Sequence, residues 1–136
     1  TYQIDGESML PILKGKDKTI HTSLFFEIGA TRAVLMNGMK YLAFRTPEDK
    51  LPKLEVGGKK ATHINDRPGG RGSESPALKK YPNYFDHNQL YDVNRDPDEQ
   101  TNLYEEMHAS KQVKKLRKEL KKYLKDLPEN FGEFKE

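Results

Sequence analysis

Residues 89–103 read Gln-Leu-Tyr-Asp-Val-Asn-Arg-Asp-Pro-Asp-Glu-Gln-Thr-Asn-Leu, a strand pattern that stops sharply. The first five residues are rich in β-formers and predict a short strand. Asp96 is then a favoured N-cap residue, Pro97 suits the first position of a helix, and Glu99 stands where the acid of a capping box would be. The stretch therefore predicts a strand, a tight turn and a capped helical turn, which is a structural corner and not an active site.

Three further strands are predicted upstream of this corner. Ser23 to Ile28 is rich in aromatic and branched residues, whereas Arg32 to Met36 and Met39 to Arg45 flank the dipeptide Asn37-Gly38. Asn-Gly between apolar runs is a strong hairpin signal, because both residues tolerate a positive φ. Both faces of this hairpin carry apolar residues, so we expect at least partial cover on both sides. The expected sheet is antiparallel, with about four strands. The predicted register sets Met36 opposite Met39, Leu35 opposite Lys40, Val34 opposite Tyr41, Ala33 opposite Leu42 and Arg32 opposite Ala43.

Ser110 to Leu127 has the clearest helical pattern in the chain. Its apolar residues recur at steps of three and four and form one stripe, while seven lysines and Arg117 occupy the other positions. Ser110 is a suitable N-cap, and Pro128 ends the pattern. This helix, packed on the sheet, predicts an α+β fold. The stripe consists of Val113, Leu116, Leu120, Tyr123, Leu124 and Leu127.

Residues 46–88 are predicted to form a long irregular insertion, because prolines and glycine runs leave little room for regular structure. A short extra strand is expected at 53–55 or at 61–64. The aromatic cluster from Tyr81 to Asp86 is expected to dock the end of the insertion onto the sheet, and the Gly-rich tip is expected to be mobile.

Length and composition predict one domain with a small core. The chain has 136 residues, of which 34% are hydrophobic and 33% charged. This apolar content predicts either a core completed by a neighbouring domain or a small sheet with a long solvated loop, and both readings stay open. The absence of cysteine excludes disulfides, thiolate metal sites and a cysteine nucleophile from this segment. The net charge of +3 is mild, and no signal peptide or membrane span is evident.

Three stretches resemble sulfatases of the arylsulfatase type (type I). Leu-Tyr-Asp-x-x-x-Asp-Pro-x-Glu-x-x-Asn-Leu at 90–103 resembles a signature near the C-terminus of the family. Residues 5–13 resemble the family segment Asp-Gly-x-Ser-Leu-Leu-Pro-Leu-Leu. Between them, Phe26-Glu27, Arg32 to Val34, Gly38 and Lys40 to Leu42 resemble the family's run into its small C-terminal sheet. The pieces stand in the family's order over nearly the whole chain.

The resemblance implies the C-terminal part of a sulfatase, a sulfuric ester hydrolase of the alkaline-phosphatase-like superfamily. Its parent would hydrolyse sulfate esters, expected to be carried on carbohydrates. The family's nucleophile is an aldehyde hydrate formed from Cys or Ser in Cys/Ser-x-Pro-x-Arg, and a divalent cation, usually calcium, meets the sulfate charge. The sequence holds no such motif. We therefore expect the nucleophile and the calcium in a preceding catalytic domain, and we assign no catalytic residue and no metal ligand here.

The implied organisation is a seam segment at 1–16, leading from the catalytic domain, and a subdomain at 17–136 that contains the 46–88 insertion. The segment alone is expected to be inactive. Its expected partners are its own catalytic domain and a sulfated carbohydrate, without nucleic acid or membrane. By resemblance, the parent is expected in the periplasm, outside the cell or in lysosomes. The alternatives are the tail of a related phosphonate or phosphate ester hydrolase, or a free-standing polyanion-binding module.

Arginine is the residue type best suited to read sulfate oxygens, because its planar fork donates two parallel hydrogen bonds. Arg32 follows a break at a strand edge, and Arg67 and Arg71 lie on the insertion beside His63. We predict that these four residues line the substrate entrance. The competing interpretation is that the arginines are solvated and that Arg32 pairs with Glu27.

The lysine-rich helix and the histidines suggest two other functions. The helix has enough positive charge to neutralise several phosphates or sulfates, but it lacks the aromatic residues of a nucleic-acid platform, and lysine-coated helices are ordinary soluble surfaces. The four histidines are scattered and none has the i, i+4 spacing of a helical metal site.

Overall fold

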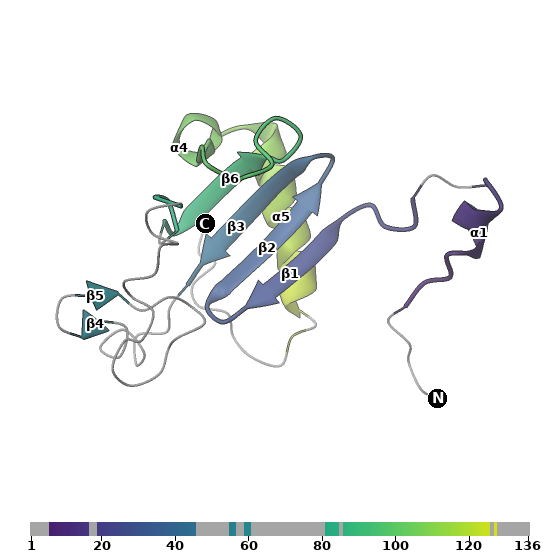
Figure 1. Ribbon diagram of the computed structural model, residues 1–136, viewed down its shortest axis with the longest axis horizontal. Coiled ribbons are helices and arrows are strands. Elements are labelled where there is room, and N and C mark those ends of the chain that lie inside the picture. Colours follow the sequence, from purple (N-terminus) through teal and green to yellow (C-terminus); the bar gives the residue numbers. More distant parts are fainter. Residues whose placement is uncertain are drawn as a thin grey trace.

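The computed structural model describes residues 6–16, 19–45, 55–56, 59–60, 81–84, 86–125 and 127. Its centre is a four-stranded antiparallel sheet in the order β1-β2-β3-β6, with helix α5 packed on one face (Figure 1). The sheet and helix form the predicted α+β fold. The strands are β1 (Leu24–Ile28), β2 (Thr31–Met36), β3 (Met39–Phe44) and β6 (Asn88–Asp92). The described residues also form α1 (Leu10–Leu13), β4 (Glu55–Val56), β5 (Lys59–Lys60), α4 (Tyr104–Met107) and α5 (Lys111–Lys125).

The β2–β3 hairpin is closed by Asn37 and Gly38, whose φ values are 53° and 77°. This left-handed backbone is what the Asn-Gly signal predicts. The observed register confirms all five predicted residue pairs. A Cβ atom at Gly38 would lie 2.1 Å from the side-chain nitrogen of Asn94, so the chain leaving β6 also requires a glycine here.

The face of the sheet that α5 covers, called here the inner face, carries the core. Successive residues of a strand point to opposite faces, so alternate residues of all four strands meet the helix. Val34, Tyr41 and Leu90 have no exposed surface, and neither have the three helix residues that pack in the same cluster. The predicted stripe thus forms one side of the core. The cluster consists of Val34, Met39, Tyr41, Ala43, Leu90, Val113, Leu116 and Leu120.

Polar contacts fix both ends of α5. The Ser110 hydroxyl accepts a hydrogen bond from the Val113 N–H at 3.2 Å, which confirms the predicted N-cap. At the start of β1, Ser23 is buried, and its hydroxyl donates to Glu119 at 3.0 Å and lies 2.9 Å from the Tyr123 hydroxyl. The Tyr123 ring stacks on Phe25 with 5.1 Å between centroids. These contacts hold the edge strand β1 against the helix.

The predicted corner after β6 is a hydrogen-bonded hub. Asn102 accepts bonds from the Leu90 N–H at 2.9 Å and the Tyr104 N–H at 3.0 Å, and its amide donates to the Asn88 carbonyl at 3.1 Å. One side chain therefore connects two backbone groups of β6 to the start of α4. The Leu103 N–H donates to the Leu90 carbonyl at 2.8 Å, which continues the edge of the sheet beyond β6.

The prediction of a capped helical turn at 96–100 is wrong. The segment forms turns, and the next helix, α4, begins only at Tyr104. Asp96 accepts a bond from the Thr101 N–H at 2.8 Å, so its carboxylate closes a loop and caps no helix. Glu99 has a φ of 54° and its carboxylate binds Lys40 at 2.7 Å. Glu99 therefore forms an ion pair with a distant residue of the sheet and not the predicted capping box with Asp96.

The predicted insertion is described only in part. In place of one extra strand at 53–55 or 61–64, the described residues form a two-residue pair, in which β4 begins at the last residue of the first expected position and β5 lies outside both. The aromatic end docks as predicted, since Tyr81 and Tyr84 line a hollow on the sheet. The Gly-rich tip lies outside the described residues. In the described part of the chain, no helix combines the length and the apolarity that crossing a bilayer needs.

The short helix α1 stands away from the sheet (Figure 1). The Leu10 N–H donates to the Ser8 hydroxyl at 3.3 Å, and Pro11 occupies the first turn. Met9, Leu10 and Leu13 remain 58%, 51% and 76% exposed. These three side chains give the start of the described chain an exposed apolar surface.

Replacing Leu120 by Ala is expected to lower the free energy of unfolding by about 2–5 kcal/mol, because the side chain is fully buried and its removal leaves a cavity. Guanidinium unfolding followed by circular dichroism measures this. The same substitution at Leu13, which is 76% exposed, is expected to change stability by less than about 0.5 kcal/mol. Equal losses at both sites would contradict the assignment of the core.

Candidate functional site

The face of the sheet opposite α5, called here the outer face, is apolar and incompletely covered. Leu24, Phe26 and Ile28 project from edge strand β1 and are 45%, 44% and 49% exposed. Burial increases across the sheet toward β6, where Tyr91 is 3% exposed. Single exposed leucines are common on protein surfaces, but three large apolar side chains in one row along an edge strand make a contiguous patch. We call these three residues the β1 strip.

A hollow of about 210 Å³ lies on the outer face beside the β1 strip. It is smaller than the roughly 300–1,000 Å³ typical of pockets that hold small molecules. Among the residues that the structure describes, its lining includes an acid and no basic side chain, which disfavours a sulfate group. An apolar side chain from another protein surface suits it better. The lining residues are Ile28, Thr31, Leu42, Tyr81, Tyr84, Gln89, Tyr91 and Glu99.

The polar groups of the hollow bind one another. Gln89 donates to the carbonyls of Asp86 at 3.0 Å and Tyr84 at 3.3 Å, and it accepts a hydrogen bond from the Tyr91 hydroxyl at 2.9 Å. Gln89 is 5% exposed, so these bonds satisfy an amide that burial would otherwise penalise. The network ties the end of the insertion to β6 and gives the hollow a fixed wall.

An ion pair crosses the other side of the hollow. Lys40 on β3 binds Glu99 at 2.7 Å, and its ammonium lies 5.4 Å from the centroid of the Phe26 ring. The lysine thus connects the corner after β6 to the β1 strip through a charge pair and a cation–π contact. Both charged side chains are only partly exposed, which limits screening by solvent.

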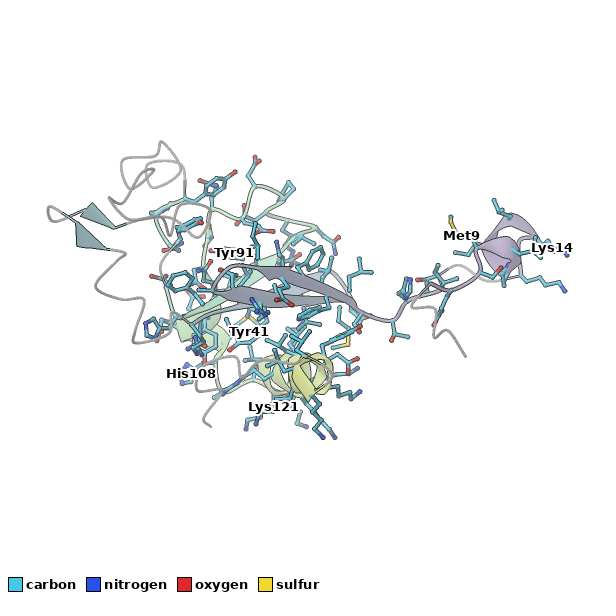
Figure 2. All side chains as sticks on the ribbon, turned by 90° about the horizontal axis from the view of Figure 1, so that it is seen from below. Met9, Lys14, Tyr41, Tyr91, His108 and Lys121 are labelled. Atoms are coloured by element: carbon cyan, nitrogen blue, oxygen red, sulfur yellow. The ribbon has the colours of Figure 1, made fainter. Side chains whose placement is uncertain are left out.

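Two buried tyrosines have raised pKa values. Burial raises the pKa of Tyr91 well above its usual range, and the negative charges of Glu99, Asp86 and Asp96 act in the same direction. Tyr91 is therefore a hydrogen-bond donor to Gln89 and not a phenolate nucleophile. On the inner face, burial raises the pKa of Tyr41 to about 12, although Arg117 and Arg45 oppose the shift. Figure 2 shows the two rings on opposite sides of the sheet.

The structure places one of the four predicted substrate-binding residues. Arg32 is buried on the inner face and binds Glu27 at 2.7 Å and the carbonyls of Gly29 at 2.7 Å and Thr31 at 3.0 Å. Its guanidinium therefore has the predicted partner Glu27, and it lies across the sheet from the hollow. Substrate contact by Arg32 stays a prediction. His63, Arg67 and Arg71 lie outside the described residues.

Metal ligands were not expected in this segment. Among the residues that the structure describes, no three His, Asp or Glu side chains are grouped so that they would hold a metal ion. Acidic side chains in this part of the chain bind the backbone instead. The Asp92 carboxylate accepts hydrogen bonds from the N–H groups of Asn94 at 3.1 Å and Arg95 at 3.3 Å.

The sequence predicted a seam segment at 1–16, whereas the β1 strip was missed. The signal is the alternation Leu24, Phe26, Ile28, which puts three large apolar side chains on one face of a strand. The hollow left no comparable signal, because its walls come from strands and loops up to 71 residues apart, from Ile28 to Glu99.

Comparison of the chain with models of protein families and with curated proteins finds no significant match. The geometry of the outer face and the residue patterns therefore carry the functional argument.

The raised pKa of Tyr41 gives a prediction about how stability depends on pH. A native tyrosine with a raised pKa stabilises the fold fully below the unfolded pKa of about 10, and this contribution is lost as pH rises toward the native pKa of about 12. At neutral pH, Tyr41→Phe is expected to lose about 1 kcal/mol, because the bond to Asn88 at 2.8 Å is removed.

Between pH 10 and pH 12 the stability difference between the wild type and Tyr41→Phe is expected to shrink, because only the wild type carries this ionising phenol. Urea unfolding at a series of pH values measures the difference, and groups common to both proteins cancel. A difference that stays constant or grows over this range would contradict the raised pKa.

Proposed function

We propose that this chain is the C-terminal subdomain of a sulfatase whose parent hydrolyses sulfate esters, carried on carbohydrates. In that enzyme the segment is structural: it supports the catalytic domain and shapes the outer part of the substrate cleft. The observation that carries the proposal is the apolar outer face, with the β1 strip and the hollow, on the side of the sheet that α5 leaves open.

The family-like residues support this reading through their structural roles. In the 90–103 signature, Leu90 is buried in the core, Asp96 closes the corner, Glu99 pairs with Lys40 and Asn102 connects β6 to α4. Each of these side chains makes a contact that holds the sheet or the corner. The resemblance therefore covers the features that specify this sheet and corner, and it assigns no chemistry to them.

The outer face and α1 suit contact with a preceding domain. Within the stretch that resembles the family segment, Met9, Leu10 and Leu13 expose apolar surface. The β1 strip adds a second apolar patch from the first strand after that segment. A catalytic domain in the same polypeptide would cover both patches at a high effective concentration.

The chemistry would reside in the catalytic domain, where the expected calcium would polarise the sulfate oxygens. The residues of this segment contribute packing, and by prediction substrate contacts from Arg32 and from His63, Arg67 and Arg71 on the insertion. A polymeric sulfated carbohydrate is the expected substrate class.

Upstream coding sequence tests the proposal directly. Determining the codons that precede Thr1 is expected to show Cys or Ser in x-Pro-x-Arg, the precursor of the aldehyde nucleophile. The isolated chain is expected to give no hydrolysis of an aryl sulfate, with or without added calcium. Turnover of the purified chain above the buffer blank, or an upstream sequence without the motif, would contradict the proposal.

The outer face is tested by Leu24→Lys in the longer protein. In the isolated chain this change is expected to alter stability by less than about 0.5 kcal/mol, because Leu24 is 45% exposed. In the longer protein it would bury an unpaired charge at the seam, and we expect a loss of roughly 2 kcal/mol or more. Differential scanning calorimetry of both proteins measures this.

Gln112→Lys is the matched control, because it adds the same charge at an exposed position of α5. It is expected to be neutral in both contexts. A Leu24→Lys variant that is equally harmless in the longer protein would show that no domain covers the β1 strip.

A further inference from the structure

The lysines of α5 form one continuous surface. Each helical residue advances by about 100°, so the seven lysines fall within an arc of about 120° that is centred opposite the buried Leu120. Figure 2 shows Lys121 on the far side of α5 from the sheet, whereas Tyr91 lies beyond the other face of the sheet. We call this surface the lysine face. It consists of Lys111, Lys114, Lys115, Lys118, Lys121, Lys122 and Lys125.

The positive charge of the chain is concentrated on this helix. With seven lysines, Arg117 and Glu119, α5 carries a net charge of +7, whereas the whole chain carries +3. The other residues therefore sum to −4. Glu119 binds Lys122 at 2.6 Å and the Ser23 hydroxyl, and the bond from Lys122 holds the pKa of this carboxyl below its usual value. The Glu119 carboxylate, at the edge of the lysine face, therefore already has two hydrogen-bond partners.

The sequence alone is compatible with an ordinary soluble surface, but the gathering of all seven lysines of α5 on one face asks for a further explanation. A surface that only needs to be soluble carries both signs interspersed. Here lysines follow one another at i, i+4, as in Lys111–Lys115, Lys114–Lys118 and Lys121–Lys125, and such like-charge pairs destabilise a helix. An anionic partner would relieve this repulsion.

We propose that the lysine face binds a linear sulfated polysaccharide, at a site remote from the ester bond that is cut. This inference rests on the proposed function, and it names a polymer-binding surface in addition to the substrate cleft. The lysine face spans about 21 Å from Lys111 to Lys125, enough for several sulfate groups in a row. It lies on the opposite side of the sheet from the outer face, so a docked catalytic domain leaves it accessible.

A sulfated glycan suits this surface better than a single-stranded nucleic acid does. Single-stranded nucleic acids bind where aromatic side chains offer stacking platforms beside the charges. The aromatic residue of α5, Tyr123, instead stacks on Phe25 against the sheet.

The test measures binding of a heparin-derived oligosaccharide to the chain by titration calorimetry at several salt concentrations. The variant Lys114→Gln/Lys118→Gln removes two charges from the lysine face. The matched control, Lys14→Gln/Lys16→Gln, removes two exposed charges near α1. We expect the helix variant to bind about tenfold or more weakly. The slope of log K against log salt should become shallower by about one to two. The control should stay within about twofold of the wild type.

Three results would overturn the inference. Equal weakening by both variants would show that net charge, and not the lysine face, attracts the anion. Equally tight binding of single-stranded DNA with the same number of charges would assign a general polyanion or nucleic-acid surface. No binding at physiological salt would reject a dedicated site. Thermal unfolding of each variant confirms that the helix is intact.

The binding assay does not depend on the upstream nucleophile, so the two proposals fail separately. An upstream sequence without the motif would remove the sulfatase and leave glycan binding standing. In the longer protein, Lys114→Gln/Lys118→Gln is expected to raise KM for a sulfated polymer and to leave kcat/KM for a small aryl sulfate unchanged. A fall in kcat/KM for both substrates would place the lysines in the catalytic cleft and contradict a remote site.

Discussion

Packing of one helix on one face of the sheet is the constraint on which the rest of this structure depends. Val34, Tyr41 and Leu90 lose all contact with solvent because α5, together with Leu103, Tyr104 and Met107 at α4, lies over them. That contact fixes the rotation of the helix, since a stripe at 3.6-residue spacing has one orientation that buries it. The lysines are thereby turned to solvent. The same contact leaves the second face of the sheet to be covered by something else.

The corner after β6 leads the chain from the edge of the sheet back toward the helix that packs on it. A strand at the edge of the sheet must be followed by a reversal that brings the chain to the start of α5. Asn102 does this by binding backbone groups on both sides of the turn, and Leu103 adds one more bond to β6. The corner also approaches Gly38 so closely that a side chain there would collide with Asn94. Turn and corner therefore constrain each other.

The parts of the fold that were predictable from sequence are those set by neighbouring residues. The Asn37-Gly38 turn determines the register of β2 and β3 because the side-chain period of a strand is two. The apolar stripe of α5 determines which side of the helix is buried, because residues at steps of three and four lie on one face of a helix. Glu99 shows the limit: its sequence context fits a capping box, but Lys40, 59 residues away, binds its carboxylate and the backbone turns left-handed. The alternation in β1 indicates a face, but no local pattern reveals whether a neighbour covers it.

The two surfaces of this fold differ in what they can bind, and their placement keeps them independent. The outer face is apolar, so its contacts grow with the area removed from water and are not screened by salt. The lysine face works through counterion release, so its contacts weaken as salt rises. Because the sheet and the core separate them, a ligand on one does not occupy the other. Under the proposed function, a polymer held by α5 would stay near the catalytic domain after each cleavage, which raises its effective concentration there without any new contact at the active site. The sheet would then act as a rigid spacer between a covered seam and an exposed polymer-binding helix.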